Sequence, residues 1–282
     1  MNDEFALDPA VASRIQELRL LLSKFGFYEG RFISRFPGGR VKLALEGIAD
    51  QTIRQKVHLL MERYKETVFV RSNRMYDVVK PWVDNAAEQH AKAPFKTVIS
   101  TEARPGFVHI DDVDPTSFPG SRDTSVTGSI ENIMNAIRPL LNVSGSLYLV
   151  DPYFQPWAAR TRELLSAVLT ARKQGAEFKA FVSSKEWPEL EYADKKIREA
   201  LPRLSSHNGN FKVAVCNDEE STARMHARYL FSEKGGVRLD KGLQTDEGMI
   251  DLSFIDKDVH GDLLRKFVER TDSYKVIREY SY

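Results

Sequence analysis

Leu147-Tyr-Leu-Val-Asp-Pro-Tyr-Phe154 and Phe178-Lys-Ala-Phe-Val182 are the two stretches that decide the fold class. Each contains a short apolar run of the length of a buried strand, and a helical pattern that ends at Gly175 lies between them. The alternation continues, with helices expected at 129–141, 158–174, 189–201 and 258–270 and strands at 146–150, 178–182, 211–215, 227–231 and 248–256. Strands that alternate with helices indicate βαβ units and a largely parallel sheet.

The sequence before this α/β region has a different pattern. Helices are predicted over 9–25, 50–65 and 77–91, short strands over 68–71, 97–100 and 107–110, and a loop-rich stretch over 25–40. Residues 111–128 are rich in turn-forming side chains and have no periodicity. We therefore predict a mainly α-helical N-terminal domain over 1–110, a linker or long loop over 111–128, and an α/β domain over 129–282.

The composition is that of a soluble globular protein, with 42% hydrophobic and 29% charged residues among 282. A single cysteine, Cys216, excludes an intrachain disulfide and a cysteine metal cluster. The chain begins with Met1-Asn-Asp-Glu, which is not the start of a secretory signal, and it has no apolar run long enough for a transmembrane helix. We expect a cytoplasmic protein with no integral membrane segment, no metal site and no cofactor.

Positive charge is concentrated near the N-terminus, although the net charge of the chain is only +1. Residues 14–80 contain 14 Lys and Arg but 7 Asp and Glu. Arg31 and Arg35 alternate with phenylalanines, a mixture that can neutralise phosphates and stack on bases. These two arginines are candidate substrate-binding residues for nucleic acid. The alternatives are a solvated basic face and a loop that packs its phenylalanines on neighbouring helices.

Asp151 and Tyr153 directly follow an apolar strand and precede a helix. Ligands of open α/β sheets bind outside the carboxyl ends of the strands. Both residues are therefore candidate substrate-binding residues. The alternative is a capped turn in which Asp151 accepts hydrogen bonds from nearby backbone N–H groups.

His226-Ala-Arg228 is the motif best suited to catalysis. Within a strand, residues two apart point to the same face, so an imidazole and a guanidinium would reach one phosphate. The imidazole could attack phosphorus or transfer a proton, and the guanidinium could hold two phosphate oxygens. Glu233 follows near the strand end and could pair with either group. The alternative is a histidine and an arginine with purely structural partners.

Taken together, the strand that ends in Asp151-Pro-Tyr-Phe154, the helix that ends at Gly175, and His226-Ala-Arg228-Tyr-Leu-Phe-Ser-Glu233 resemble the phospholipase D superfamily over roughly residues 129–270. The signature of that superfamily is His-x-Lys-x4-Asp. Its spacing is kept here, while arginine replaces lysine and glutamate replaces aspartate. A Gly-Ser-x-Asn element that usually follows the motif is missing. The resemblance implies a phospholipase D-like sheet with helices on both faces.

The resemblance also implies a function, a metal-independent phosphodiesterase. His226 would be the nucleophile or acid, Arg228 would bind phosphate, and Glu233 would be the orienting carboxylate. The superfamily site combines two motifs, and this chain has one, so an active enzyme would be a homodimer, and the expected activity is that of a nuclease. The alternative is a catalytically degenerate module, similar to the phospholipase D-like domain of some MIT-domain proteins. Such a module would bind partner proteins, a phosphate ligand or a membrane surface, and it could be a subunit of a multi-component bacterial defence system.

Overall fold

A computed structural model describes residues 3–36, 45, 48–71, 74–114, 118, 122–204, 210–217, 225–270 and 274–281, without the side chains of 201–204. The chain divides into two compact units, residues 1–121 and residues 122–282.

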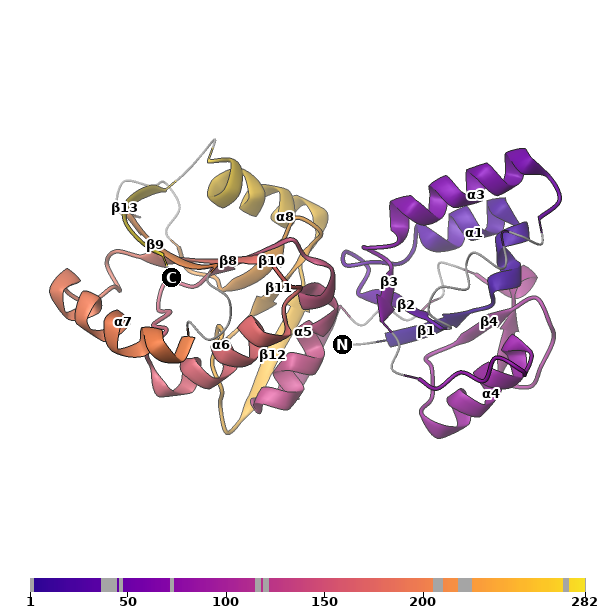
Figure 1. Ribbon diagram of the computed structural model, residues 1–282, viewed down its shortest axis with the longest axis horizontal. Coiled ribbons are helices and arrows are strands. Elements are labelled where there is room, and N and C mark those ends of the chain that lie inside the picture. Colours follow the sequence, from indigo (N-terminus) through magenta and orange to yellow (C-terminus); the bar gives the residue numbers. More distant parts are fainter. Residues whose placement is uncertain are drawn as a thin grey trace. The chain divides into compact units, whose positions relative to one another are not determined.

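A five-stranded parallel sheet forms the centre of the first unit (Figure 1). The strands are β1 (Asp3–Leu7), β2 (Arg31–Arg35), β3 (Phe69–Arg71), β4 (Val98–Ser100) and β5 (Phe107–His109). Their order is β3-β2-β1-β4-β5, and every neighbouring pair is parallel. This order reverses at β1, because chain order runs outward from β1 in both directions.

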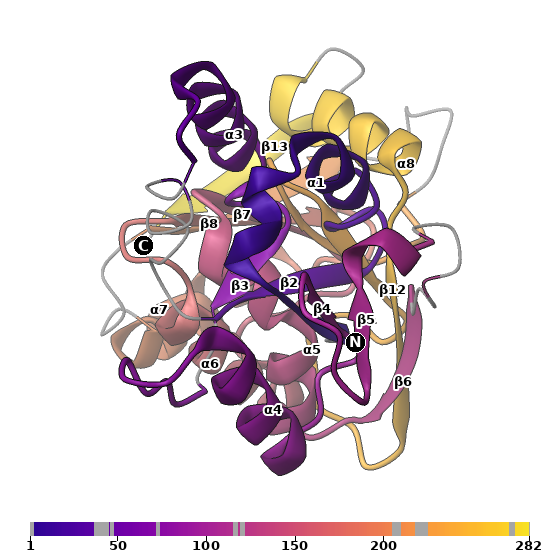
Figure 2. The ribbon, with the colours of Figure 1, turned by 90° about the vertical axis from the view of Figure 1, so that its right-hand side faces the viewer.

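Helices cover both faces of this sheet. The helical elements are η1 (Pro9–Ser13), α1 (Ile15–Leu22), α3 (Gln51–Tyr64), α4 (Trp82–Lys92) and η2 (Ile110–Asp112). Helices α1 and α3 lie on one face and α4 lies on the other (Figure 2). Two separate buried clusters match this division, one around Phe5 and Ile33 and one around Ala6 and Phe36.

The prediction of a mainly helical N-terminal domain is wrong, since the first unit is itself an α/β layer structure. The predicted loop region 25–40 contains β2, and β1 has no counterpart among the predicted strands. Both strands are short and lack a long apolar run, and neighbouring elements bury them. Pairing across the sheet therefore determines these elements more than their local sequence does.

An eight-stranded mixed sheet forms the second unit, in the order β13-β9-β8-β7-β10-β11-β12-β6. The strands are β6 (Asp123–Thr127), β7 (Ser146–Val150), β8 (Glu177–Ser183), β9 (Phe211–Asn217), β10 (Tyr229–Ser232), β11 (Gly236–Leu239), β12 (Met249–Phe254) and β13 (Lys275–Ser281). Strands β7, β8 and β9 are parallel, and all other neighbouring pairs are antiparallel.

Both faces of this sheet also carry helices (Figure 1). They are α5 (Ile130–Val143), α6 (Ala159–Ala171), α7 (Leu190–Leu204), α8 (Lys257–Leu263) and the π-helical segment η4 (Leu264–Glu269). Helices α5, α6 and α7 cover one face, while α8 covers the other. Leu263 and Phe267 pack on Phe181 and Phe231 of that second face. The α/β class of this region is therefore as predicted.

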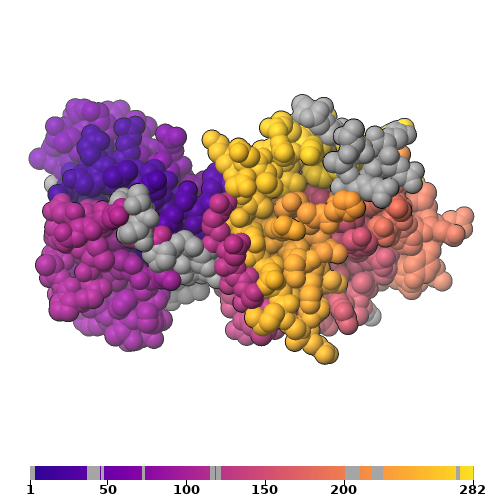
Figure 3. Space-filling model, turned by 180° about the vertical axis from the view of Figure 1, so that it is seen from behind, coloured from indigo at the N-terminus to yellow at the C-terminus, as the bar shows by residue number. Residues whose placement is uncertain are grey.

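Residues 123–127 form a strand where the sequence indicated a linker or long loop over 111–128. Strand β6 pairs with β12 at one edge of the sheet (Figure 3). Its sequence, Asp-Thr-Ser-Val-Thr, alternates between exposed and half-buried positions. A polar edge strand exposes most of its side chains and has no apolar pattern to reveal it.

No helix in the described ranges is long and apolar enough to cross a membrane.

Candidate functional site

Asp151 lies at the carboxyl end of β7 and is 5% exposed. Its backbone N–H donates to the carbonyl oxygen of Phe181 on β8, and its Oδ1 accepts from the N–H of Tyr153 at 3.0 Å. Burial raises the pKa of the Asp151 carboxyl to about 6, although the Tyr153 N–H and the Arg228 guanidinium act in the opposite direction. Asp151 is thus a capped turn residue that also carries a titratable group inside the protein.

Arg228 lies beside Asp151 because β10 runs antiparallel to β7. The pairing of Tyr229 with Val150 places the preceding residue, Arg228, at the carboxyl end of β7. Arg228 Nε is 3.4 Å from Asp151 Oδ1, and Arg228 Nη1 donates to the carbonyl oxygen of Asp240. The guanidinium carbon lies 5.1 Å from the centre of the exposed Tyr153 ring. We call Asp151, Tyr153 and Arg228 the arginine cluster.

Gly242 forms the back wall of the arginine cluster. Its φ of +70° is a conformation that side chains with a Cβ adopt at a cost. A Cβ at this position would collide with Asp151 Oδ2 and would come within 3.0 Å of Arg228 Cδ. The turn after β11 therefore approaches the cluster so closely that only glycine fits. Neither Gly242 nor the Asp240 carbonyl is among the site residues predicted from the sequence. The sequence indicates this turn through Gly242 itself, because glycine favours turns.

His226 is exposed and lies just before β10, two residues from Arg228. Because β10 begins at Tyr229, His226 and Arg228 are not at strand positions, and the alternation of a strand does not set their directions. Within the described part of the chain, no hydrogen bond or ion pair holds the His226 ring. The imidazole is therefore open to solvent and to a ligand.

Glu233 lies at the opposite end of β10 from Arg228. Its Oε1 accepts from the N–H of Gly145 at 2.9 Å and its Oε2 from the N–H of Ser146 at 3.4 Å, at the amino end of β7. The four residues of β10 lie between it and Arg228, a separation of roughly 17 Å along an extended strand. Glu233 supports the turn between α5 and β7, and the structure does not bring it to His226 or Arg228.

Arg31 and Arg35 belong to the first unit and lie at the two ends of β2. Arg31 is buried, and its guanidinium donates to the Phe118 carbonyl oxygen at 2.7 Å and pairs with Glu29 at 2.9 Å. Arg35 donates to the Lys65 carbonyl oxygen at 2.6 Å and is partly exposed. Burial of Arg31 removes it from any surface that nucleic acid could contact. Arg35 lines a cavity of the first unit.

Among the residues that the structure describes, no group of three or more His, Cys, Asp and Glu side chains is arranged to hold a metal ion. A comparison with protein-family models finds none that matches the chain, and no curated protein matches it in sequence.

Proposed function

We propose that the second unit is a phospholipase D-like module that binds a phosphodiester group of single-stranded nucleic acid at the arginine cluster without cleaving it. The observation that carries this proposal is the position of Arg228, which is fixed at the carboxyl end of β7 by the buried Asp151 and the Asp240 carbonyl. A guanidinium held on one side presents its remaining N–H donors to an incoming anion without a large loss of side-chain entropy.

The neighbours of Arg228 support nucleic acid as the ligand. Tyr153 is 51% exposed and lies directly beside the guanidinium. An aromatic ring next to an arginine is the combination that proteins use to stack a base and contact the adjoining phosphate. His226 adds a second polar ring that is exposed to solvent.

The charge arrangement argues against hydrolysis by one chain. A nucleophilic histidine needs a partner that orients its ring, and Glu233 instead binds backbone N–H groups at the far end of β10. Asp151 partly neutralises Arg228, which weakens its effect on a developing phosphorane charge. A second complete motif, which would protonate the leaving group, does not occur in the sequence. The other His-x-Lys pair, His90-Ala-Lys92, lies in α4 of the first unit and has Thr97 at the position of the acidic residue.

A binding titration tests the proposal. A fluorescein-labelled single-stranded 12-mer is titrated with the full chain, and fluorescence anisotropy is followed at two salt concentrations. Arg228→Gln is expected to weaken binding about tenfold or more, since it removes a charge-assisted contact to phosphate. The matched control is Arg138→Gln, an exposed arginine of α5, which should leave affinity unchanged. Equal affinity of Arg228→Gln and wild type for the 12-mer would refute the proposal. Binding to anionic lipid vesicles without binding to the 12-mer, measured in a parallel titration, would refute it as well.

A second candidate is the homodimeric phosphodiesterase, and the exposure of His226 is what favours it. A second copy of the chain could bring its own His226 to the same phosphate, because no contact in the described residues encloses this ring. This candidate requires a dimer in solution and activity that His226→Ala abolishes. Sedimentation velocity of the full chain tests the first requirement, and a monomer at micromolar concentration would eliminate the candidate.

A further inference from the structure

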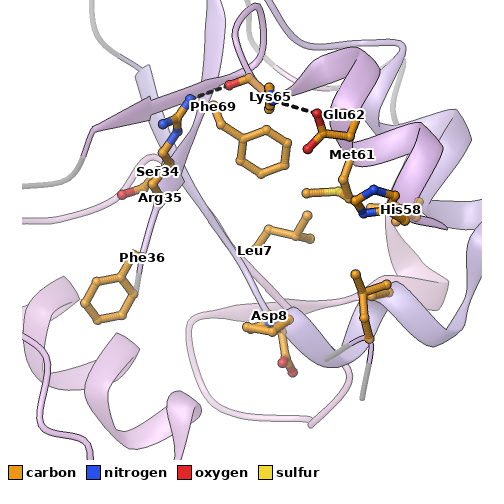
Figure 4. Close-up of a pocket in the computed structure, with 14 residues that line it drawn as sticks. Leu7, Asp8, Ser34, Arg35, Phe36, His58, Met61, Glu62, Lys65 and Phe69 are labelled. Atoms are coloured by element: carbon orange, nitrogen blue, oxygen red, sulfur yellow. Dashed lines mark hydrogen bonds and ion pairs between the residues drawn. The ribbon is translucent and has the colours of Figure 1, made fainter. Parts of the chain in front are cut away.

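A cavity of about 260 Å³ lies in the first unit, between the sheet and helix α3 (Figure 4). Leu7 at the end of β1, Phe69 of β3 and Met61 of α3 form much of its apolar wall. The strand order of this unit reverses at β1, and ligands of open parallel sheets bind outside the carboxyl ends of the strands at such a reversal. The cavity is lined by Leu7 and Asp8 at the end of β1 and by Ser34 and Arg35 at the end of β2, so it lies at the carboxyl ends of these two strands, on the β2 side of the reversal.

Arg35 provides positive charge at the rim of the cavity. It uses one donor, Nη2, on the Lys65 carbonyl oxygen, and a guanidinium has five N–H donors. Arg71 is its register partner on β3, so two guanidinium groups leave adjacent strands at neighbouring positions. Burial lowers the pKa of Arg35, the charge of Arg71 lowers it further, and Glu66 opposes this effect. An anion beside Arg35 would relieve the repulsion between the two guanidinium groups.

The other charged groups that line the cavity are already paired. Lys65 Nζ bonds to Glu62 at 2.6 Å. The Asp8 carboxylate accepts hydrogen bonds from the Ala10 N–H, the Ser100 hydroxyl and the N–H and hydroxyl of Thr101. It points away from Leu7 and Met61 (Figure 4). Asp8 caps the start of η1 directly after β1, where dinucleotide-binding folds hold a phosphate, so its negative charge disfavours an anion there and favours the Arg35 side.

We propose that this cavity binds a small aromatic anion, whose ring body packs on Leu7, Met61 and Phe69 and whose carboxylate or phosphate bonds to Arg35. The volume limits the body to about two fused rings, below the range of most drug-sized ligand sites. The site is separate from the arginine cluster of the second unit and does not depend on its function.

Three probes of similar shape test the proposal on the full chain: 1-naphthoate, 1-naphthyl phosphate and the neutral 1-naphthalenemethanol. Isothermal titration is expected to give a Kd of about 1 mM or tighter for at least one anion. The neutral probe should bind at least tenfold more weakly. Comparison of the two anions distinguishes a carboxylate ligand from a phosphate ligand. Arg35→Gln should remove the preference for the anion. The control Arg63→Gln, at an exposed position of the cavity-lining helix α3, should preserve it.

A second variant protects the test against misfolding. Ala12 is buried and lines the cavity, so Ala12→Leu should reduce the binding of all three probes. Circular dichroism and the Tm of both variants confirm that they fold. The proposal is overturned if neither anion binds below 10 mM, if the neutral probe binds as tightly as the anions, or if folded Arg35→Gln binds them as wild type does.

Discussion

Asp151 is the residue on which the charge of the arginine cluster depends. It is almost fully buried, and its pKa of about 6 lies well above the ordinary aspartate value because burial disfavours the carboxylate. Near neutral pH the carboxylate pairs with Arg228, and near pH 5 it is largely neutral. Protonation of Asp151 therefore gives Arg228 more net positive charge toward solvent.

The ligand affinity of the arginine cluster should consequently rise as pH falls. Oligonucleotide binding is expected to strengthen several-fold between pH 7.5 and pH 5.5, because the carboxyl that competes for Arg228 becomes neutral near pH 6. Asp151→Asn should flatten this dependence. The measurement is made in a His226→Gln background, so that the comparison isolates the effect of Asp151. An unchanged pH profile in Asp151→Asn would contradict the role given to Asp151.

Protein stability should also depend on the ionisation of Asp151. The folded-state pKa is raised, so the contribution of Asp151 to stability is fully present below the unfolded value near 4 and is lost as pH rises through about 6. The free energy of unfolding of wild type relative to Asp151→Asn should fall by about 2–3 kcal/mol from pH 4 to pH 7. Urea titrations across this range measure it. A relative stability that rises with pH would mean that Arg228 outweighs burial.

At the scale of elements, the turn after β11 determines how closely Arg228 and Asp151 approach. Gly242 and Gly175 both have positive φ, at +70° and +79°, but a Cβ at Gly175 would meet no atom within 4 Å. Replacing either by alanine incurs the same kind of backbone strain, about 1–2 kcal/mol. Only Gly242→Ala adds the collision with Asp151. The two glycines are therefore a matched pair.

Gly242→Ala is expected to lower the free energy of unfolding by at least about 1 kcal/mol more than Gly175→Ala does, since overpacking adds to backbone strain. It should also weaken oligonucleotide binding, because Arg228 must move. Chemical denaturation and the anisotropy titration measure the two effects. Equal losses of stability in the two variants would show that the turn accommodates a Cβ and does not constrain the cluster.

The elements that the sequence predicts best are those whose apolar pattern is complete in itself. Strand 146–150 coincides with β7, and strand 178–182 lies within β8. These strands are buried on both faces by helices and so consist of near-continuous apolar residues. The sequence does not reveal strands β1 and β2, because they are short and contain charged residues such as Glu4 and Arg31. They are defined by pairing with each other, which is not visible in a local pattern.

The candidate site was predictable in part for the same reason. Asp151 follows from its position after a strong strand, and Arg228 follows from its spacing to His226. Their contact does not follow from the sequence, because it requires β10 to lie antiparallel beside β7. The same pairing places Glu233 at the opposite end of β10, beside the amino end of β7. A motif read along one strand therefore groups residues that the tertiary structure separates.

At the scale of the whole molecule, the boundary between the two units lies before β6. Each unit has its own buried cluster of apolar side chains, around Phe5 in the first and around Phe181 in the second. Strand β6 pairs with β12 through residues 123–127 and completes the edge of the second sheet. The second unit should therefore require residues 122–128, which the sequence assigned to a linker.

Fragments of the second unit test this boundary. Residues 122–282 should unfold in one cooperative transition, and residues 129–282 should have a lower Tm because β12 loses its paired neighbour. Each 1 kcal/mol of lost stability lowers the Tm by roughly 2–4 °C for a domain of this size. Differential scanning calorimetry of both fragments provides the measurement. Identical melting temperatures would show that β6 contributes nothing to the unit.

The most direct test of the account is hydrolysis of a phosphodiester by the full chain in EDTA. Bis-p-nitrophenyl phosphate and the labelled 12-mer are incubated with wild type and with His226→Ala at a protein concentration that saturates oligonucleotide binding. We predict that the 12-mer stays intact and that p-nitrophenol release is the same in both proteins and equal to the buffer rate. Chelator-resistant cleavage by wild type that disappears in His226→Ala would contradict the account and establish a catalytic site.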